Sequence, residues 1–407
     1  MSRKILINGA GIAGPACAYW LGKFGFEVTL LEIAPELRTG GYIIDFWGAG
    51  FDLAEKMGVL PELLADGYRM QELRLVDERG KRVGGFPVDV FEESTHGRYI
   101  SIPRGDLAAA LYRSMAPDVE RIFGDHIVEI EQQVDGISVR LNSGAVRLFD
   151  LVIGADGLHS QVRSLVFGPQ SQFEHFLGFE VAAFEARGYR PRDELVYVSY
   201  STPGKQIARF SLHNDSTLVL MVLASDHNQV YRSENEKRDR LHQSFRHTGW
   251  ESDVILDAMD HSTDLYFDRV SQIRMDRWTK DRVALIGDAA SCPSLLAGQG
   301  SALAIIQAYV LAGELASHWP DFGKAFSRYE ELLQSFLHKK QSAAEGFASS
   351  FAPKTQFGIW ARTMVTRLMR FRPIANWVLG RSLADHICLP DYGVSESKSH
   401  LTRMAEL

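Results

Sequence analysis

The segment Gly9 to Gly14, which reads Gly-Ala-Gly-Ile-Ala-Gly, constrains the fold of this chain more than any other feature. The apolar run Lys4 to Asn8 precedes it, a stretch with helical periodicity covers Gly14 to Gly25, and a second apolar run covers Glu27 to Leu31. Strand, glycine turn, helix and strand make a βαβ unit, whose strands pair in parallel within a sheet covered on both faces. The sequence therefore predicts an α/β domain built on a parallel sheet.

The glycines of this turn predict a binding site for a dinucleotide. Gly9 permits the tight turn, Gly11 lets a pyrophosphate approach the backbone, and Gly14 lets the helix pack on the strand. Together with Ile12 and Ala13, the helix N-terminus presents free N–H groups and a partial positive charge to the phosphates. A glycine-rich turn can also be purely structural, but the strand, helix and strand around this one favour dinucleotide binding.

Glu32 follows the second apolar run directly. At this place the ribose of a bound dinucleotide needs a hydrogen-bond acceptor, and a carboxylate would repel a 2′-phosphate. Glu32 therefore favours FAD or NAD over NADP at this site.

The middle of the chain has a different pattern. From about Phe176 to Ser225, apolar and polar residues alternate, and the runs Leu195 to Tyr200, Gln206 to Leu212 and Thr217 to Ala224 are rich in β-branched and aromatic types. The turn residues 213–216 join the last two runs as a hairpin. This pattern is typical of an antiparallel sheet and predicts a second domain.

The first pattern returns at Arg282 to Ile286, so the dinucleotide domain is expected to be discontinuous. We assign residues 1–170 and 270–325 to this domain, and residues 171–269 to an antiparallel substrate-binding sheet that includes some strands from about 70–103. Residues 326–407 are expected to form a helical region that bridges the two. Further helices are predicted over Asp52 to Leu64, Arg104 to Ala116 and Ala325 to Ala384.

Two more motifs accompany the glycine turn. The first is Asp150-Leu-Val-Ile-Gly-Ala-Asp156-Gly157, and the second is Ala284-Leu-Ile-Gly287-Asp288, followed by Gly298-Gln299-Gly300. With three motifs in this order and at comparable spacing, the chain resembles the class A flavin monooxygenases, the family of para-hydroxybenzoate hydroxylase. A plain NAD dehydrogenase would have no use for the last motif.

The resemblance implies non-covalently bound FAD and gives several residues a role. Asp288 would hydrogen-bond the ribityl chain, although capping the helix that follows is its alternative role. Backbone N–H groups at the helix start would face the pyrimidine side of the flavin, where a helix dipole stabilises the charge of the reduced ring. Asp156 would lie between the FAD and nicotinamide contacts, and Arg104 would reach FAD. The cofactor-binding residues implied in the second half of the chain are Gly287, Asp288, Gly298, Gly300, Ser301 and Ala302.

The segment Arg38-Thr-Gly40-Gly41-Tyr-Ile-Ile-Asp45 resembles a loop of the tetracycline-inactivating monooxygenases within this family. The resemblance implies that Asp45 contacts the flavin and makes Arg38 a further candidate, with a solvated loop cation as the alternative. The chain departs from the family in Ser291-Cys292-Pro293-Ser294-Leu295, where a histidine is usual, and in Ala302, where an asparagine is usual. These departures flank the reactive edge of the flavin and weaken the inference about substrate.

By resemblance, NADPH or NADH reduces the flavin, and O2 then adds to form a C4a-hydroperoxyflavin that hydroxylates an electron-rich carbon. The implied substrate is an aromatic or polyketide-like small molecule, with tetracyclines among the candidates. No catalytic base is identified, because Arg209, His213 and Tyr200 fit surface or packing roles better. A flavin dehydrogenase or reductase that forms no hydroperoxide remains an alternative, as does a non-catalytic FAD- or drug-binding protein.

Composition excludes other classes of function. The net charge of −7 offers no basic surface for nucleic acid, and three widely separated cysteines without a CxxC pattern argue against disulfides and structural zinc. We expect a cytoplasmic monomer without a metal site or stable membrane insertion, in which the apolar segment Ser301 to Ser317 is a buried core helix.

The segment Phe357 to Leu383 combines arginines with large apolar residues. We expect a helix packed across both domains with its basic face in water, interrupted at Arg372-Pro373. A helix on a membrane surface is the alternative.

Overall fold

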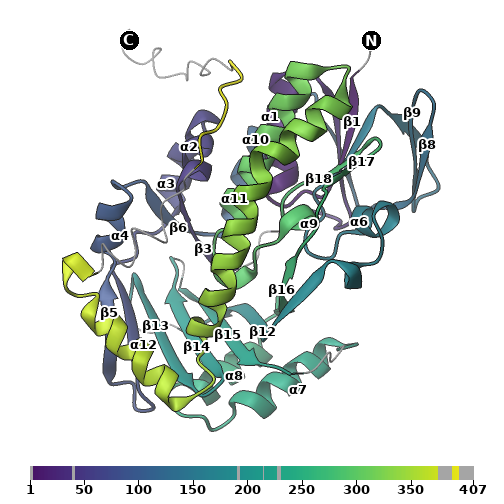
Figure 1. The fold of residues 1–407 in the computed structure, drawn as a ribbon. Helices are drawn as coiled ribbons and strands as arrows, with labels where there is room; N and C mark the ends of the chain where they lie inside the picture. The colour runs from purple at the N-terminus through teal and green to yellow at the C-terminus, as the bar shows by residue number, and fades with distance from the viewer. Residues whose placement is uncertain are drawn as a thin grey trace, which may run out of the picture.

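The computed structural model describes residues 3–38, 42–189, 193–213, 215–226, 231–374 and 387–393. Two large sheets lie at opposite ends of the molecule, and a long helix runs from one toward the other (Figure 1). The fold is mixed α/β, with a parallel sheet, a separate antiparallel sheet and C-terminal helices, as the sequence predicts.

The first sheet has six strands in the order β17-β18-β11-β1-β2-β7. The five strands from β18 to β7 in this order all run parallel to one another. Among the described strands of this sheet, only β17 is antiparallel to its neighbour. The apolar strands are buried on both faces, which is why they read as continuous apolar runs. The strands are β1 (Lys4–Asn8), β2 (Glu27–Glu32), β7 (Glu120–Phe123), β11 (Leu151–Gly154), β17 (Thr279–Lys280) and β18 (Val283–Leu285).

Helices α1 (Ala13–Lys23), α5 (Arg104–Ser114) and α10 (Gly300–His318) belong to the core of this first domain. α10 packs against α1, where the Trp20 and Tyr309 rings meet edge to face at 4.9 Å between centroids. Within the described residues, α10 is also the helix with the length and hydropathy to cross a membrane, and 72% of its most apolar window is buried in the protein. This burial agrees with the predicted core helix.

The second sheet has seven strands in the order β16-β12-β15-β14-β13-β4-β5. Neighbouring strands are antiparallel except for β13 and β4, which pair in parallel. The predicted domain boundary at residue 270 falls inside β16, which pairs with β12 as far as Ile273. The strands are β4 (Glu72–Val76), β5 (Arg82–Pro87), β12 (Glu174–Arg187), β13 (Val196–Thr202), β14 (Lys205–Ser211), β15 (Ser216–Ala224) and β16 (Tyr266–Ile273).

One face of the second sheet is covered by α7 (Glu234–Phe245) and α8 (Ser252–Asp260). Alternate residues of the central strands, such as Ile207 and Met221, pack against these helices. The opposite face turns toward the first domain and the C-terminal helices, and Val181 and Val222 lie there with Leu296.

Smaller elements fill the space between and beside the sheets. β3 (Ile43–Trp47) pairs with β6 (Tyr99–Pro103), and β8 (Ile127–Gln133), β9 (Gly136–Leu141) and β10 (Val146–Phe149) form a meander. The short helices are α2 (Ala49–Lys56), α3 (Leu60–Asp66), α4 (Asp89–Ser94), α6 (Gln161–Val166) and α9 (Asp288–Ser291), with 3₁₀ turns at Gln170–Gln172 and Leu295–Ala297.

The helix predicted over Asp52 to Leu64 is wrong in one respect, because two helices, α2 and α3, occupy this region. Gly58 lies between them with φ +76°, a conformation that ends a right-handed helix.

The C-terminal helices also differ from the prediction. α11 (Phe322–Phe351) is the helix that contacts both α10 and the turn at Leu295–Ala297, whereas α12 (Gln356–Leu368) packs on β5 and β13 of the second sheet. Arg362 of α12 points inward and bonds to Gln206 and Ser201, so the basic face of α12 does not lie wholly in water.

The Tyr329→Phe variant tests how α11 is joined to the first domain. The buried Tyr329 hydroxyl lies 3.0 Å from the carbonyl oxygen of Leu285 and 3.1 Å from Oε1 of Gln307, and it donates to this pair. Loss of this donor is expected to lower the free energy of unfolding by about 1–2 kcal/mol. Urea denaturation at a fixed FAD concentration measures the change. The half-buried Tyr112, which packs on Phe123, gives the control Tyr112→Phe. Equal stability of the two variants would show that the hydroxyl of Tyr329 contributes nothing.

Candidate active site

The glycine turn closes tightly on the ends of β1, β2 and β11. The N–H of Gly9 donates to the carbonyl oxygen of Leu31 at 2.7 Å, and Gly9 has φ +112°. A Cβ on Gly9 would lie 2.5 Å from the carbonyl oxygen of Ala155, and a Cβ on Gly14 would lie 1.9 Å from that of Gly9. Neither position has room for a side chain, in agreement with the tight turn and the close packing that the sequence predicts for these two glycines.

The carboxylate of Glu32 is fixed beside this turn. It accepts hydrogen bonds from the N–H groups of Ala10, at 2.7 Å, and Ala34, at 3.0 Å. A carboxylate has room for about four hydrogen bonds, so two acceptor positions remain for a ligand hydroxyl.

Arg104 lies over the glycine turn. Its terminal nitrogen is 3.5 Å from the position that a Cβ on Gly11 would take, and its backbone N–H donates to the carbonyl oxygen of Tyr42 at 3.0 Å. The positive charge of Arg104 also acts on Asp288, where it opposes the increase in pKa caused by burial. One guanidinium therefore lies close to the first and the third motif.

Asp288 begins α9, immediately after β18 and Gly287. Burial raises the pKa of its carboxyl group, while Arg104 and a hydrogen bond with the Cys292 thiol lower it. One carboxylate oxygen is 3.5 Å from the position that a Cβ on Gly300 would take, which places Asp288 at the start of α10. The N-cap of α9 is Gly287, and Asp288 is the first residue of this four-residue helix, so the choice between a cofactor contact and a structural role rests on the variant described below.

The start of α10 is built by glycines. Gly298 has φ +67°, and within the described residues the N-cap Gln299 makes no side-chain capping bond to the first N–H groups of the helix, which are those of Gly300, Ser301 and Ala302. The N–H of Gly287 donates to Oε1 of Gln307 at 3.1 Å and ties the third motif to the same helix. The N-terminus of a helix of 19 residues suits a negatively charged group.

The carboxylate of Asp156, which is expected to lie between the FAD and nicotinamide contacts, is held by four donors of the protein itself. Its carboxylate accepts from the Asn8 side chain at 2.9 Å, the Ser160 hydroxyl at 2.5 Å, and the N–H groups of Gln161 and Val162 at 2.8 and 3.0 Å. These four donors occupy the hydrogen-bonding capacity of a carboxylate. Asp156 therefore fixes the start of α6 beside β1 and positions the site from behind.

Arg163 is a residue of the site that the sequence reasoning missed. The side chain is fully buried, donates to the carbonyl oxygen of Ala289 at 3.0 Å and to that of Leu158 at 2.7 Å, and so joins the second motif to the third. The signal in the sequence was an arginine between Val162 and the run Leu165-Val166, shortly after the Asp156-Gly157 motif. A cation in such a position needs buried acceptors.

The loop with the family departures is anchored by the second domain and by α11. The carbonyl oxygen of Cys292 accepts from the N–H of Ile273 and the side chain of Gln341, both at 3.2 Å, and that of Pro293 accepts from Gln272 at 2.8 Å. Ser294 adopts φ +119°, which few residues with a side chain adopt, while its hydroxyl accepts from the N–H of Leu296.

Two further residues, Asp45 and Arg38, are predicted to contact the cofactor. Asp45 of β3 accepts from the hydroxyls of Tyr99, at 2.6 Å, and Ser101, at 2.7 Å, and burial raises its pKa. Arg38 is exposed, and the Gly40-Gly41 turn lies outside the described residues.

The three residues considered as bases have the packing or surface roles that we expected. Arg209 pairs with Asp193 and Glu251 on the face that α8 covers, Tyr200 donates to the carbonyl oxygen of Thr248, and the exposed His213 stacks on Tyr68.

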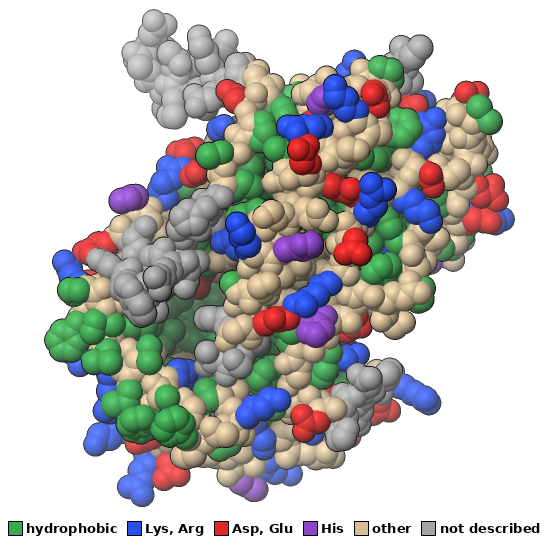
Figure 2. Space-filling model, in the orientation of Figure 1, with side chains coloured by type: hydrophobic (Ala, Val, Ile, Leu, Met, Phe, Trp, Pro, Cys, Tyr) green, Lys and Arg blue, Asp and Glu red, His purple; other side chains and the backbone are tan. Residues whose placement is uncertain are grey.

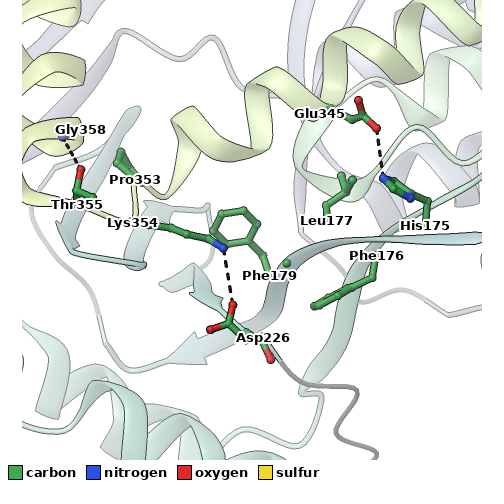
Figure 3. Close-up of a pocket in the computed structure, with 12 residues that line it drawn as sticks. His175, Phe176, Leu177, Phe179, Asp226, Glu345, Pro353, Lys354, Thr355 and Gly358 are labelled. Carbon is green, nitrogen blue, oxygen red and sulfur yellow. Dashed lines mark hydrogen bonds and ion pairs between the residues drawn. The ribbon is translucent and has the colours of Figure 1, made fainter.

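A hollow of about 890 Å³ opens between β12, the end of β15 and the junction of α11 with α12 (Figure 3). Phe176, Leu177 and Phe179 of β12 line one side, and Pro353, Thr355 and Gly358 line the other. Two ion pairs stand at its walls, His175 with Glu345 at 3.4 Å and Lys354 with Asp226 at 4.0 Å. Phe179 belongs to the same apolar cluster as Leu296, so the hollow adjoins the loop that leads to Gly298 and Gly300.

The comparison with protein families decides what this site belongs to. The model of the FAD binding domain family matches residues 2–346, which include all three motifs and both parts of the first domain. The chain belongs to the class A flavin-dependent monooxygenases.

Relatives of known class agree over almost the full length of this monooxygenase. A flavin-dependent monooxygenase of Legionella longbeachae serogroup 1 (strain NSW150) is 36% identical over 399 residues, which cover 96% of this chain and 98% of the relative. A second flavin-dependent monooxygenase, from an unknown prokaryotic organism, is 37% identical over 358 residues, 88% of each chain.

Solved structures show the same arrangement of domains. The tetracycline destructase Tet(51) superposes with a TM-score of 0.82 at 34% identity, over 96% of this chain and 100% of that one. HpxO of Klebsiella pneumoniae, solved with FAD and uric acid, has a TM-score of 0.77 over 94% of this chain and 95% of that one. At 20% identity, this second likeness shows the fold alone.

Asp288→Ala is expected to weaken FAD binding by about tenfold to a hundredfold, because a hydrogen bond to a charged group contributes about 1.5–3 kcal/mol. Titration of the apoprotein with FAD, followed by flavin fluorescence, measures the change. Asp276→Ala, at an exposed position beyond β16, is the matched control. Wild-type affinity together with early melting would give Asp288 a purely structural role.

Proposed function

We propose that this monooxygenase uses NADPH or NADH and O2 to hydroxylate a polycyclic aromatic or polyketide-like molecule, with tetracyclines among the candidate substrates. The observation that carries the proposal is the hollow of about 890 Å³ beside the loop 291–300. A cleft of this size lies at the upper end of the range that small-molecule sites occupy, and it is larger than a single phenol ring requires.

The residues present fit FAD. Glu32 keeps free acceptor positions for a ribose, Gly11 and Arg104 form a cradle for a pyrophosphate, and Asp288 offers a buried carboxylate to the ribityl hydroxyls. The uncapped N–H groups of Gly300, Ser301 and Ala302 suit the electron-rich end of the flavin. The chemistry that bound FAD supplies is hydride acceptance from the nicotinamide and activation of O2.

The cofactor is expected to be held without a covalent bond. Cys292 is the cysteine nearest to Asp288, and burial, with the charge of Asp288 second, raises the pKa of its thiol well above the usual range. A thiol that stays protonated is a poor nucleophile.

Arg362 places a positive charge on the face of the second sheet that is opposite to α7 and α8. Its guanidinium donates to Oε1 of Gln206 at 2.7 Å, the Ser201 hydroxyl at 2.8 Å and the carbonyl oxygen of Phe351 at 2.6 Å, all of them neutral. Burial lowers its pKa to about 10, so the group remains a cation at neutral pH. Its Nε has no hydrogen-bond partner within the described part of the chain.

Arg362 also lies close to the hollow. Gly358, which lines the hollow, precedes Arg362 by four residues, so the two share one face of α12. An acidic enol or phenol of a substrate that reached this face would supply the anion that the guanidinium lacks, and a phenolate or enolate is the activated form for attack on electrophilic oxygen. We assign Arg362 the role of orienting such a group.

The comparison with tetracycline destructases supports the substrate class. The likeness to Tet(51), and to Tet(55) at 32% identity and a TM-score of 0.82, covers 96% of this chain and therefore extends through the second sheet into the C-terminal helices.

A substrate panel tests the proposal. The FAD-loaded enzyme is incubated with NADPH or NADH, O2 and compounds that range from para-hydroxybenzoate to anthracyclines and tetracyclines, and the mass of each product is measured. We expect a gain of one oxygen atom by a multi-ring substrate, coupled to nicotinamide oxidation. Coupled turnover of single-ring phenols alone would contradict the substrate class. Nicotinamide oxidation with reduced product and no added oxygen would favour the dehydrogenase or reductase.

Replacing Arg362 tests the assigned role of its charge. With the substrate found in the panel, Arg362→Met is expected to raise KM by about tenfold or more, because a hydrogen bond from a charged group is lost, and Arg362→Lys is expected to restore part of the loss. The exposed Arg367, on the same helix, provides Arg367→Met as a control. An unchanged KM in Arg362→Met would limit Arg362 to packing.

A further inference from the structure

Helix α12 is amphipathic in the reverse of the usual sense. Its inward side carries Arg362, Thr363 and Thr366. Arg362 donates to Gln206 and Ser201. Thr363 and Thr366 lie close to Gly84, and the hydroxyl of Thr366 accepts from the N–H of Gly85. A surface helix of a globular protein normally turns its apolar stripe toward the core and its polar side chains toward water. Here the polar side chains are used for packing.

The outward side of α12 is apolar. Phe357, Trp360, Met364, Leu368 and Phe371 recur at helical spacing, and the first two rings stack with 5.6 Å between centroids. Phe357 is 74% exposed, Trp360 58%, Leu368 48% and Phe371 63%. Figure 2 shows hydrophobic side chains gathered at the lower left, where α12 lies in Figure 1. We call these five residues the α12 patch.

A contiguous apolar patch of this kind marks an interaction surface. It is larger than the exposed apolar pair on β10, Val146 and Leu148, which are 65% and 56% exposed and lie on the meander of the first domain. Burial of several large aromatic and aliphatic side chains would stabilise a complex through the hydrophobic effect.

The charges around the patch indicate what covers it. From Ala352 to Ile374 the sequence contains no aspartate or glutamate, although the whole chain has a net charge of −7. Lys354, Arg367, Arg370 and Arg372 are exposed along this stretch. Arg372 also contacts Asp89 and Glu93 of α4, at 3.7 and 3.1 Å, whereas no acidic residue lies on α12 itself.

Aromatic residues flanked by cations fit an anionic lipid surface. Phenylalanine and tryptophan enter the boundary between headgroups and acyl chains, and lysine and arginine interact with the phosphates of anionic lipids. A second copy of this chain on the same patch would instead bring two sets of cations together, which disfavours self-association. We propose that the α12 patch binds the protein peripherally to a bilayer that contains anionic lipids.

The patch and the hollow lie on different sides of α12. Thr355, the N-cap of α12, and Gly358, in its first turn, line the hollow, and Gly358 shares the face of Arg362 rather than that of the patch. The proposal on lipid binding does not depend on the identity of the substrate.

Vesicle sedimentation with the FAD-loaded, full-length protein tests the proposal. The vesicles contain either phosphatidylcholine alone or phosphatidylcholine with phosphatidylglycerol. We expect binding to the anionic vesicles, weaker binding to the neutral ones, and a loss of affinity at high salt. The double variant F357S/W360S is expected to reduce binding by about tenfold or more, since two interfacial aromatic side chains are lost.

Two further variants keep the test decisive. L148S removes an exposed leucine from the first domain and is expected to bind like the wild type. R370E reverses one charge beside the patch without altering its apolar residues and is expected to weaken binding to anionic vesicles only. Circular dichroism and flavin absorbance check that each variant is folded, and R370E remains informative if F357S/W360S is not.

Several outcomes would overturn the proposal. These are absence of binding to anionic vesicles, equal binding of wild type and F357S/W360S, or an equal loss in L148S. Self-association in sedimentation velocity that F357S/W360S abolishes, without vesicle binding, would assign the patch to a second copy of the chain.

Discussion

The parallel pairing of β18, β11, β1 and β2 is the constraint on which the site depends. Because parallel strands end at the same edge of a sheet, Gly9, Glu32, Asp156 and Asp288 follow four neighbouring strands and meet there, although long stretches of chain separate them. The tight approach of Gly14 to Gly9 then sets α1 directly on this edge. A ligand that spans the edge contacts residues from both parts of the first domain.

A second set of contacts holds the two domains in a fixed relation. Gln341 of α11 and Gln272 of β16 bond to the backbone of the loop 291–294, so the loop is held from the second domain and from the C-terminal helix at the same time. His159 and Asp268, 2.9 Å apart, add a contact between the second motif and β16. The buried contacts of Gln341 and Gln272 have few alternative partners, and they therefore specify the arrangement more than they stabilise it.

The sequence predicts the parallel sheet, the antiparallel sheet and the family, because glycine motifs and alternation depend on local backbone geometry. It does not predict the use of individual polar side chains. Asp156 resembles a ligand contact in the sequence, yet its four donors come from Asn8 and the start of α6, which only the folded chain brings together. Arg163 and Arg362 read as ordinary surface cations until their buried acceptors are known. The orientation of α12 could not be predicted for the same reason. The spacing of its residues distinguishes an apolar face from a polar face, but it does not tell which of the two packs against the rest of the protein.

The divided first domain has a consequence for synthesis of the protein. During translation the chain emerges from its N-terminus, so Gly9 to Gly14 and Glu32 are available early, while β18, Asp288 and α10 follow only after the entire second sheet. A nascent chain therefore contains the glycine turn and Glu32 long before it contains the third motif. Domains usually fold as units while the ribosome is still at work. Here the parallel sheet stays incomplete until β18 has joined β11, so the edge that carries the three motifs can form only after the whole second sheet has been synthesised.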